Sequence, residues 1–121
     1  MNVDRKAMIR EYKETARPMG VYRVHNTASG KSLVGSTTDL NAMLNRQRAQ
    51  LRLGAHRDRQ LQSDWKTLGP DAFVFEVLDT LEPRDEPDYD PAADLKALET
   101  MWLDKLAPDG DPGYGRRPRT A

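Results

Sequence analysis

Two short strand-like segments joined by a turn, at residues 20–26 and 31–36, constrain the fold of this chain more than any other feature. In each segment successive side chains alternate between two faces, and the Thr-Ala-Ser-Gly sequence between them is typical of a turn. A third segment, AFVFEVLDTL at residues 72–81, is the strongest strand prediction in the chain. Its alternation predicts one face made of Phe73, Phe75, Val77 and Asp79. Together the three segments predict one small sheet.

Four segments with helical spacing of apolar residues accompany these strands. The first covers residues 2–16. The second begins after Thr37 or Thr38, either of which can cap it. Its sheet-facing side is predicted to consist of Leu40, Met43, Leu44, Gln47 and Leu51. The other two helices span about residues 57–68 and 91–106. The order α-β-β-α-α-β-α predicts an α+β domain in which helices flank a three-stranded sheet.

The composition limits the classes of protein that the chain can represent. At 121 residues, with 37% apolar and 31% charged residues, it fits one domain with a single modest core. The absence of cysteine excludes disulfides, thiolate zinc sites and cysteine nucleophiles. No apolar run approaches the roughly 18 residues of a membrane-spanning helix, and the charged start of the chain is unlike a signal peptide. We therefore expect a cytoplasmic protein without a membrane partner.

The chain divides into three predicted parts. Residues 1–17 form an N-terminal helical arm, which is a candidate contact in a homodimer, although a helix docked on its own domain fits the pattern equally well. Residues 18–106 form the α+β domain. Residues 107–121, rich in glycine, proline and charge, are typical of a flexible basic tail.

Charges are segregated along the chain, although the formal net charge is zero. Residues 45–60 carry five arginines against Asp58, whereas residues 82–104 carry eight acidic residues against Arg84 and Lys96. One surface can therefore attract phosphate while another repels it. The predicted nucleic-acid contacts are Lys31, Arg48, Arg52, Arg57 and Arg59. Solvated helix faces explain the arginines equally well, and the acidic segment is most simply a solvated connector.

Two glycine-containing motifs carry a family resemblance. The motif GVY at residues 20–22 and the motif LVG at residues 33–35 have the spacing of the Gly-Ile-Tyr and Tyr-Ile-Gly strands of the GIY-YIG nuclease family, which the chain resembles. The likeness continues through GSTTDL, LRLGAHRDRQLQSDW, LGPDAFVFEVLD and LETMWLDKL, and so covers about residues 19–106. It implies a GIY-YIG-like sheet flanked by helices.

The resemblance implies a metal-dependent endonuclease that hydrolyses phosphodiesters, with DNA as the expected substrate. Tyr22 takes the place of the tyrosine that helps to activate water, and Glu99 takes the place of the carboxylate that holds a single Mg²⁺ or Mn²⁺ ion. His56 falls on a histidine common in the homing-endonuclease branch. Such a reaction needs a deprotonated water, compensation of charge on the phosphate and a stabilised leaving group.

Three positions depart from the family pattern. Leu33 replaces the tyrosine of the second motif, Met43 replaces the phosphate-binding arginine, and Gly115 replaces a C-terminal asparagine. A phosphate-clamping arginine is worth roughly 10³ to 10⁵ in rate. Arg46 lies about one helical turn from Met43, so it is a candidate replacement clamp. Lys31 can supply a cation beside Leu33, but not a phenol.

The candidate catalytic residues are therefore Tyr22, Arg46, His56 and Glu99, with Glu99 as the metal ligand. Three functions remain open: a metal-dependent endonuclease, a catalytically inactive GIY-YIG fold that binds nucleic acid, and a protein-interaction module. The departures at Leu33, Met43 and Gly115 favour the second function, while the neutral net charge and the acidic segment favour the third.

Overall fold

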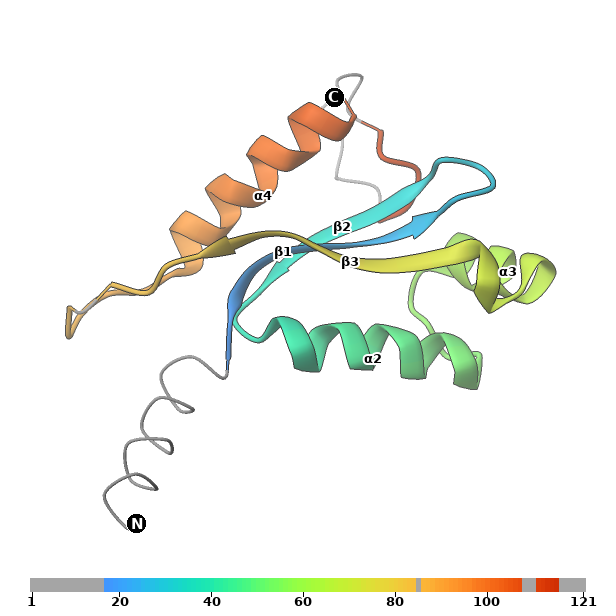
Figure 1. Cartoon of the computed structure of the whole chain (residues 1–121), viewed down its shortest axis with the longest axis horizontal. Coiled ribbons are helices and arrows are strands. Elements are labelled where there is room, and N and C mark those ends of the chain that lie inside the picture. The colour runs from blue at the N-terminus through green and yellow to red at the C-terminus, as the bar shows by residue number, and fades with distance from the viewer. Residues whose placement is uncertain (1–16, 85, 108–110, 116–121) are drawn as a thin grey trace, which may run out of the picture.

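The computed structural model describes residues 17–84, 86–107 and 111–115. They form a sheet and helices in the order β1-β2-α2-α3-η1-β3-α4 (Figure 1). The elements are β1 (Met19–Asn26), β2 (Ser32–Thr37), α2 (Leu40–Leu53), α3 (Arg59–Leu68), the 3₁₀ turn η1 (Pro70–Ala72), β3 (Phe73–Leu81) and α4 (Ala92–Leu106). The predicted α+β class is confirmed, as is the predicted order from the first strand onward. The predicted N-terminal helix, and with it the homodimer contact, lies outside the described residues.

The three strands form one antiparallel sheet in the order β2-β1-β3, with β1 in the centre. Helices cover both of its faces, with α2 and α3 on one side and α4 on the other (Figure 1). The main core, on the α2 side, is made of Val24, Leu51, Leu61, Trp65, Phe73 and Tyr114. On α4, Leu95 and Leu103 are buried. Among the helices that the structure describes, none combines the length and apolarity needed to cross a bilayer.

A bulge in β3 reverses the predicted alternation near the end of that strand. The register shifts between Val21 and Tyr22, where Leu78 of β3 has no partner on β1. Asp79 consequently lies on the same side of the sheet as Val21, and its Oδ2 accepts a 2.9 Å hydrogen bond from Trp102 Nε1 of α4. Its predicted place beside the phenylalanines of β3 is therefore wrong, because one inserted residue moves every later side chain to the opposite face.

Aspartate side chains determine where α2 and α3 begin. Asp39 is the N-cap of α2, and its Oδ1 accepts a 3.1 Å hydrogen bond from Ala42 N. The predicted caps, Thr37 and Thr38, are therefore wrong; Thr37 Oγ1 instead accepts a hydrogen bond from Asp39 N. Asp58 caps α3 in the same way, because its Oδ1 accepts a hydrogen bond from the backbone N–H of Leu61, three residues later. Each such cap contributes about 1 kcal/mol by satisfying a backbone N–H that the helix leaves free.

The described part of the predicted tail packs on the domain. Ser32 of β2 forms a parallel bridge with Gly113, and its N–H donates a 2.7 Å hydrogen bond to Pro112 O. Pro112 and Tyr114 are buried. Residues 111–115 therefore do not form the predicted flexible tail. The buried side chain of Tyr114 anchors this segment, although its composition is otherwise that of a loop.

Candidate active site

The phenol of Tyr22 lies across the edge strand β2 at Gly35. The two residues pair in the β1–β2 ladder. A Cβ added at Gly35 would lie 2.6 Å from Tyr22 Oη and 2.8 Å from Cζ, below the 3.0 Å that real Cβ contacts keep. Any side chain at residue 35 would therefore displace the ring, which is only 7% exposed. The glycine of the second motif leaves room for the hydroxyl at the edge of the sheet.

Glu99 of α4 contacts the same strand at the next residue. Ser36 Oγ donates a 2.7 Å hydrogen bond to Glu99 Oε1, and the Glu99 side chain is half-buried. Gly35 and Ser36 are neighbours on β2, and adjacent residues of a strand face opposite sides of the sheet, so the phenol and the carboxylate approach the same edge strand from opposite faces. Among the described residues, Oε2 of Glu99 takes part in no hydrogen bond or ion pair.

The charges of Glu99 and Arg46 both act on the Tyr22 hydroxyl. Burial raises the pKa of Tyr22 above its ordinary value of 10, the Glu99 carboxylate raises this pKa further, and the Arg46 guanidinium lowers it. Coulomb interactions weaken with distance and with solvent screening. Both the carboxylate of α4 and the exposed guanidinium of α2 are therefore close enough to Tyr22 for their charges to act on its hydroxyl.

The groups around Glu99 fit a divalent cation that the substrate helps to bind. Among the described residues, no group of three or more His, Asp or Glu side chains is arranged to hold a metal ion. Mg²⁺ keeps several waters and is usually bound through one or two carboxylates together with substrate phosphates. The free Oε2 of Glu99 offers an oxygen donor of the kind that such an ion prefers, while Oε1 of the same carboxylate accepts the hydrogen bond from Ser36. These residues do not form a metal site made only of protein ligands.

His56 lies in a different network, at the junction of α2 and α3. A backbone N–H can only donate, so the 3.0 Å contact from Asp58 N makes Nδ1 the acceptor. Nε2 then carries the proton and donates to Gln47 Oε1 at 2.5 Å. Buried Gln47 in turn donates from Nε2 to Met43 Sδ at 3.5 Å. Burial lowers the pKa of His56, which keeps the ring neutral at pH 7. With both nitrogens engaged, His56 holds the loop in place and is not a free base.

Two of the three substituted positions, Leu33 and Gly115, line a cavity of about 340 Å³ beside Tyr22. Its lining residues are Tyr22, Leu33, Gln47, His56, Arg57, Asp58 and Gly115. A Cβ at Gly115 would collide with Leu33 Cδ1, so the leucine fills the space next to the glycine. Two of the departures from the family pattern are therefore complementary in space, and together they form an apolar wall where the family places polar side chains.

The predicted nucleic-acid contacts are distributed over several surfaces. Arg57 is exposed and lines the cavity beside Tyr22, and Arg52 is exposed in the last turn of α2. Arg59 lines a separate cavity beyond the α2–α3 loop. The guanidinium of Arg48 lies 4.5 Å from the centroid of the Phe75 ring on β3. Lys31 Nζ lies 5.9 Å from the centroid of the Tyr114 ring in the C-terminal segment. Arg48 and Lys31 therefore already contact aromatic faces, whereas the other three present their charge to solvent.

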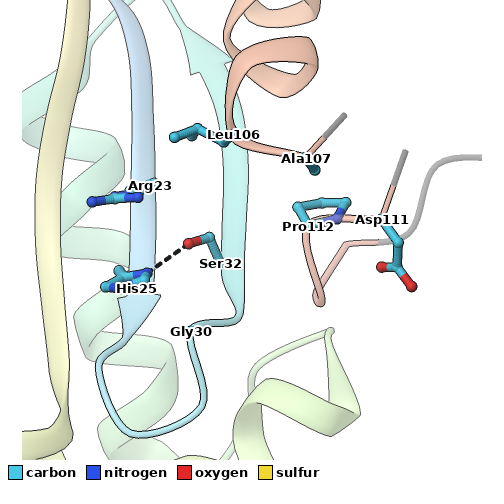
Figure 2. Close-up of a pocket in the computed structure, with 8 residues that line it drawn as sticks. All are labelled: Arg23, His25, Gly30, Ser32, Leu106, Ala107, Asp111 and Pro112. Carbon is cyan, nitrogen blue, oxygen red and sulfur yellow. Dashed lines mark hydrogen bonds between the residues drawn. The ribbon is translucent and has the colours of Figure 1, made fainter. Parts of the chain in front are cut away.

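The cavity on the opposite side of the sheet, of about 590 Å³, includes side chains that are engaged in an ion pair or a hydrogen bond. Figure 2 shows Arg23 and His25 of β1 with Ser32 of β2 along one wall, facing residues from the end of α4 and from the C-terminal segment. Arg23 Nε lies 2.6 Å from Glu76 Oε1, and His25 Nδ1 lies 2.7 Å from Ser32 Oγ. Arg23 Nε and His25 Nδ1 are therefore already engaged with neighbouring side chains.

The anchor of the C-terminal segment was missed by the sequence analysis. Tyr114 Oη donates a 2.5 Å hydrogen bond to Asp64 Oδ2 and accepts a 3.0 Å bond from the buried Asn26 Nδ2. Burial, with a contribution from Asp64, raises the pKa of Tyr114 to about 12. Gly115 N then donates to Asp58 Oδ2 at 2.6 Å. The available signal was an aromatic residue between two glycines in an otherwise polar segment.

Comparison with known proteins supports the fold. No protein-family model matches the chain, and no curated protein matches it in sequence. A point mutant of the catalytic domain of the intron endonuclease I-TevI has a TM-score of 0.65 at 22% identity, over 85% of this chain and 97% of that chain. A second structure, of the catalytic domain of the homing endonuclease I-TevI, has a TM-score of 0.57 at 27% identity, over 73% and 87%. The predicted resemblance is thus confirmed at the level of the fold: the chain has the architecture of the catalytic domain of I-TevI, a GIY-YIG homing endonuclease.

Proposed function

We propose that this chain is a metal-dependent endonuclease of the GIY-YIG type, which hydrolyses phosphodiester bonds in nucleic acid, with DNA as the substrate. The observation that carries the proposal is a shared neighbourhood in the following sense: the Tyr22 phenol and the Glu99 carboxylate approach adjacent residues of β2, and the charges of Glu99 and Arg46 both act on the phenol. Phosphodiester hydrolysis uses a group that orients or deprotonates the attacking water, a cation at the phosphate and a carboxylate that binds a metal ion.

The Tyr22 hydroxyl keeps its proton at neutral pH, because its pKa is raised. In this form Oη donates a hydrogen bond and orients a water molecule or a phosphate oxygen. Only the small deprotonated fraction accepts a proton from water. If proton acceptance at Oη limits the rate, the logarithm of the nicking rate should rise by about one for each pH unit below the pKa of Tyr22.

Arg46 supplies positive charge for the phosphate. The family's clamp position holds Met43, whose sulfur accepts a hydrogen bond from Gln47, so no cation is present there. Arg46 is exposed, so it must be ordered by the substrate. Ordering a long side chain costs about 2 kcal/mol of rotamer freedom. This cost makes the clamp weaker than a preorganised one, and slow turnover is expected.

Glu99 would hold the divalent ion, Mg²⁺ or Mn²⁺, while the Ser36 hydroxyl fixes the orientation of its carboxylate. When bound, such an ion compensates charge on the phosphate and lowers the pKa of a coordinated water. The hydrogen bond from Ser36 leaves Oε2 as the oxygen available to the ion.

Nicking of supercoiled plasmid with either metal ion tests the proposal. Glu99→Gln should slow nicking by more than the roughly 10- to 100-fold typical of an outer-shell partner, and Ser36→Ala should fall within that range. Glu86→Gln is the matched control, because it removes the same charge from an exposed residue of the acidic loop. Nicking by Glu99→Gln at the wild-type rate would contradict the assignment.

A catalytically inactive fold that binds nucleic acid is the second candidate. Leu33 favours it, since this side chain fills the space beside Gly115 and leaves an apolar wall in the cavity next to Tyr22. The two candidates separate in one pair of assays. Salt-dependent binding of duplex DNA without nicking in either metal ion would support the second candidate and contradict the first, and absence of binding would contradict both.

A further inference from the structure

A cavity of about 520 Å³ lies between the α2–α3 loop and the exposed side of α3. Its lining includes Gly54 and His56 from the loop, and Arg59, Ser63 and Lys66 from the helix. The three helix residues are spaced by four and then three positions, so they form one row along the helix. The Lys66 side chain leans over the loop, with its Cε 4.0 Å from where a Cβ on Gly54 would be.

The charge of this cavity is entirely positive. Arg59 and Lys66 are exposed, and within residues 17–84, 86–107 and 111–115 neither of them forms an ion pair. The two acidic residues next to the lining along the chain, Asp58 and Asp64, are not part of it. Asp58 Oδ1 caps α3 and its Oδ2 accepts the N–H of Gly115, while Asp64 accepts hydrogen bonds from Gln60 Nε2 and Tyr114 Oη. Two cations with a serine hydroxyl between them match the acceptors of a phosphate group.

The position of the cavity links it to the candidate active site. His56 lines both this cavity and the 340 Å³ cavity that contains Tyr22. Exposed Arg57 lies next to His56 in the chain and lines the cavity beside Tyr22. A polyanion that spans the two cavities therefore meets Arg59 and Lys66 in one and Arg57 in the other. In the 590 Å³ cavity of Figure 2, by contrast, Arg23 is paired with Glu76.

We propose that the cavity formed by Arg59, Ser63 and Lys66 binds backbone phosphates of nucleic acid next to those held in the active site. The proposal rests on the proposed function for the identity of the polymer, but not on its hydrolysis. The α3 row adds affinity and orients the strand, and it takes no part in the chemistry.

The test is binding of a fluorescein-labelled DNA duplex, followed by anisotropy in EDTA at several KCl concentrations. Each lost phosphate contact lowers the slope of log K against log salt by roughly 0.9. Arg59→Gln/Lys66→Gln should therefore reduce the slope by about 1.8, so that its affinity deficit shrinks about tenfold between roughly 50 and 200 mM salt. The control Arg84→Gln/Lys105→Gln removes two charges from exposed residues on the acidic side and should keep the wild-type slope.

Ser63→Glu provides a second variant, which places a negative charge in the cavity at an exposed helix position. It should weaken binding, whereas glutamate in place of exposed Thr67 should have a smaller effect. A slope for Arg59→Gln/Lys66→Gln equal to that of the control pair would overturn the inference, as would absence of duplex binding by the wild-type protein. Because EDTA removes any metal requirement, loss of the nuclease assignment alone would leave the expected result unchanged.

Discussion

Replacing Gly35 by alanine places a methyl group where the Tyr22 ring now lies. The new Cβ would be 2.6 Å from Oη, 2.8 Å from Cζ and 3.0 Å from Cε1 of Tyr22. The ring is rigid and buried, so it must move as a unit. The backbone of Gly35 is outside the left-handed region, so alanine meets no conformational penalty of its own.

Two opposing effects determine the magnitude. Overpacking of this kind costs about 1–3 kcal/mol, while alanine in a strand is favoured over glycine by roughly 0.5–1 kcal/mol. Gly35→Ala should therefore lower the free energy of unfolding by about 1–2 kcal/mol. In a Tyr22→Leu background the ring is absent, and the same substitution should be neutral or raise that free energy slightly. The expected coupling between the two positions is about 2 kcal/mol.

Urea denaturation of the wild type, both single variants and the double variant measures this coupling. The m-values should agree, so that differences in midpoint report stability. If Gly35→Ala changes the free energy of unfolding equally in both backgrounds, within about 0.5 kcal/mol, then the Tyr22 ring does not lie over residue 35. Nicking by Gly35→Ala should also fall, since the displaced phenol loses its place at the edge of β2.

Further predictions concern the C-terminal anchor and pH. Tyr114→Phe removes the hydroxyl that pairs with Asp64 Oδ2 and with the buried Asn26 Nδ2, and it should lower the free energy of unfolding by about 2 kcal/mol in urea. An unchanged denaturation midpoint would show that this hydroxyl does not anchor the segment. Because the pKa of Tyr114 is raised to about 12, its stabilisation is present below pH 10 and is lost as the pH rises through 12, so alkaline unfolding should be shallower in Tyr114→Phe. Because the pKa of His56 is lowered, the unfolded chain binds more protons below about pH 6.5. The free energy of unfolding should therefore decrease as the pH falls below about 6.5, and this decrease should be smaller in His56→Gln than in the wild type. An equal pH dependence in the two proteins would argue against a buried neutral His56 ring.

Local sequence patterns predict the sheet and helices because the side chains that face the core repeat with the period of each element. The polar residue Gln47 shows the strength of this signal, since its helical spacing places it on the buried side of α2, where it is found. The bulge at Leu78 escapes the pattern, because alternation alone does not reveal an inserted residue. Asp79 was assigned to the wrong face for this reason.

The candidate site depends on contacts between distant parts of the chain, which periodicity cannot supply. Tyr22 and Glu99 were paired only through the family resemblance, and the structure adds Gly35 and Ser36 as the reason that they approach the same strand. The role of Tyr114 follows from its contacts with distant side chains, so composition alone predicted a loop. In this sequence, the motif glycines and the isolated aromatic residue in a polar segment are the features that best indicate contacts between distant parts of the chain.

The most direct test of the shared neighbourhood is the pKa of Tyr22, measured by NMR with ring-labelled tyrosine in the wild type and in two charge variants. We expect the pKa of Tyr22 to lie above 10 in the wild type, to be lower in Glu99→Gln and higher in Arg46→Gln, and to be unchanged in the control Glu86→Gln. A Tyr22 pKa that neither Glu99→Gln nor Arg46→Gln moves would contradict this expectation, because the phenol, the carboxylate and the guanidinium would then not share one site.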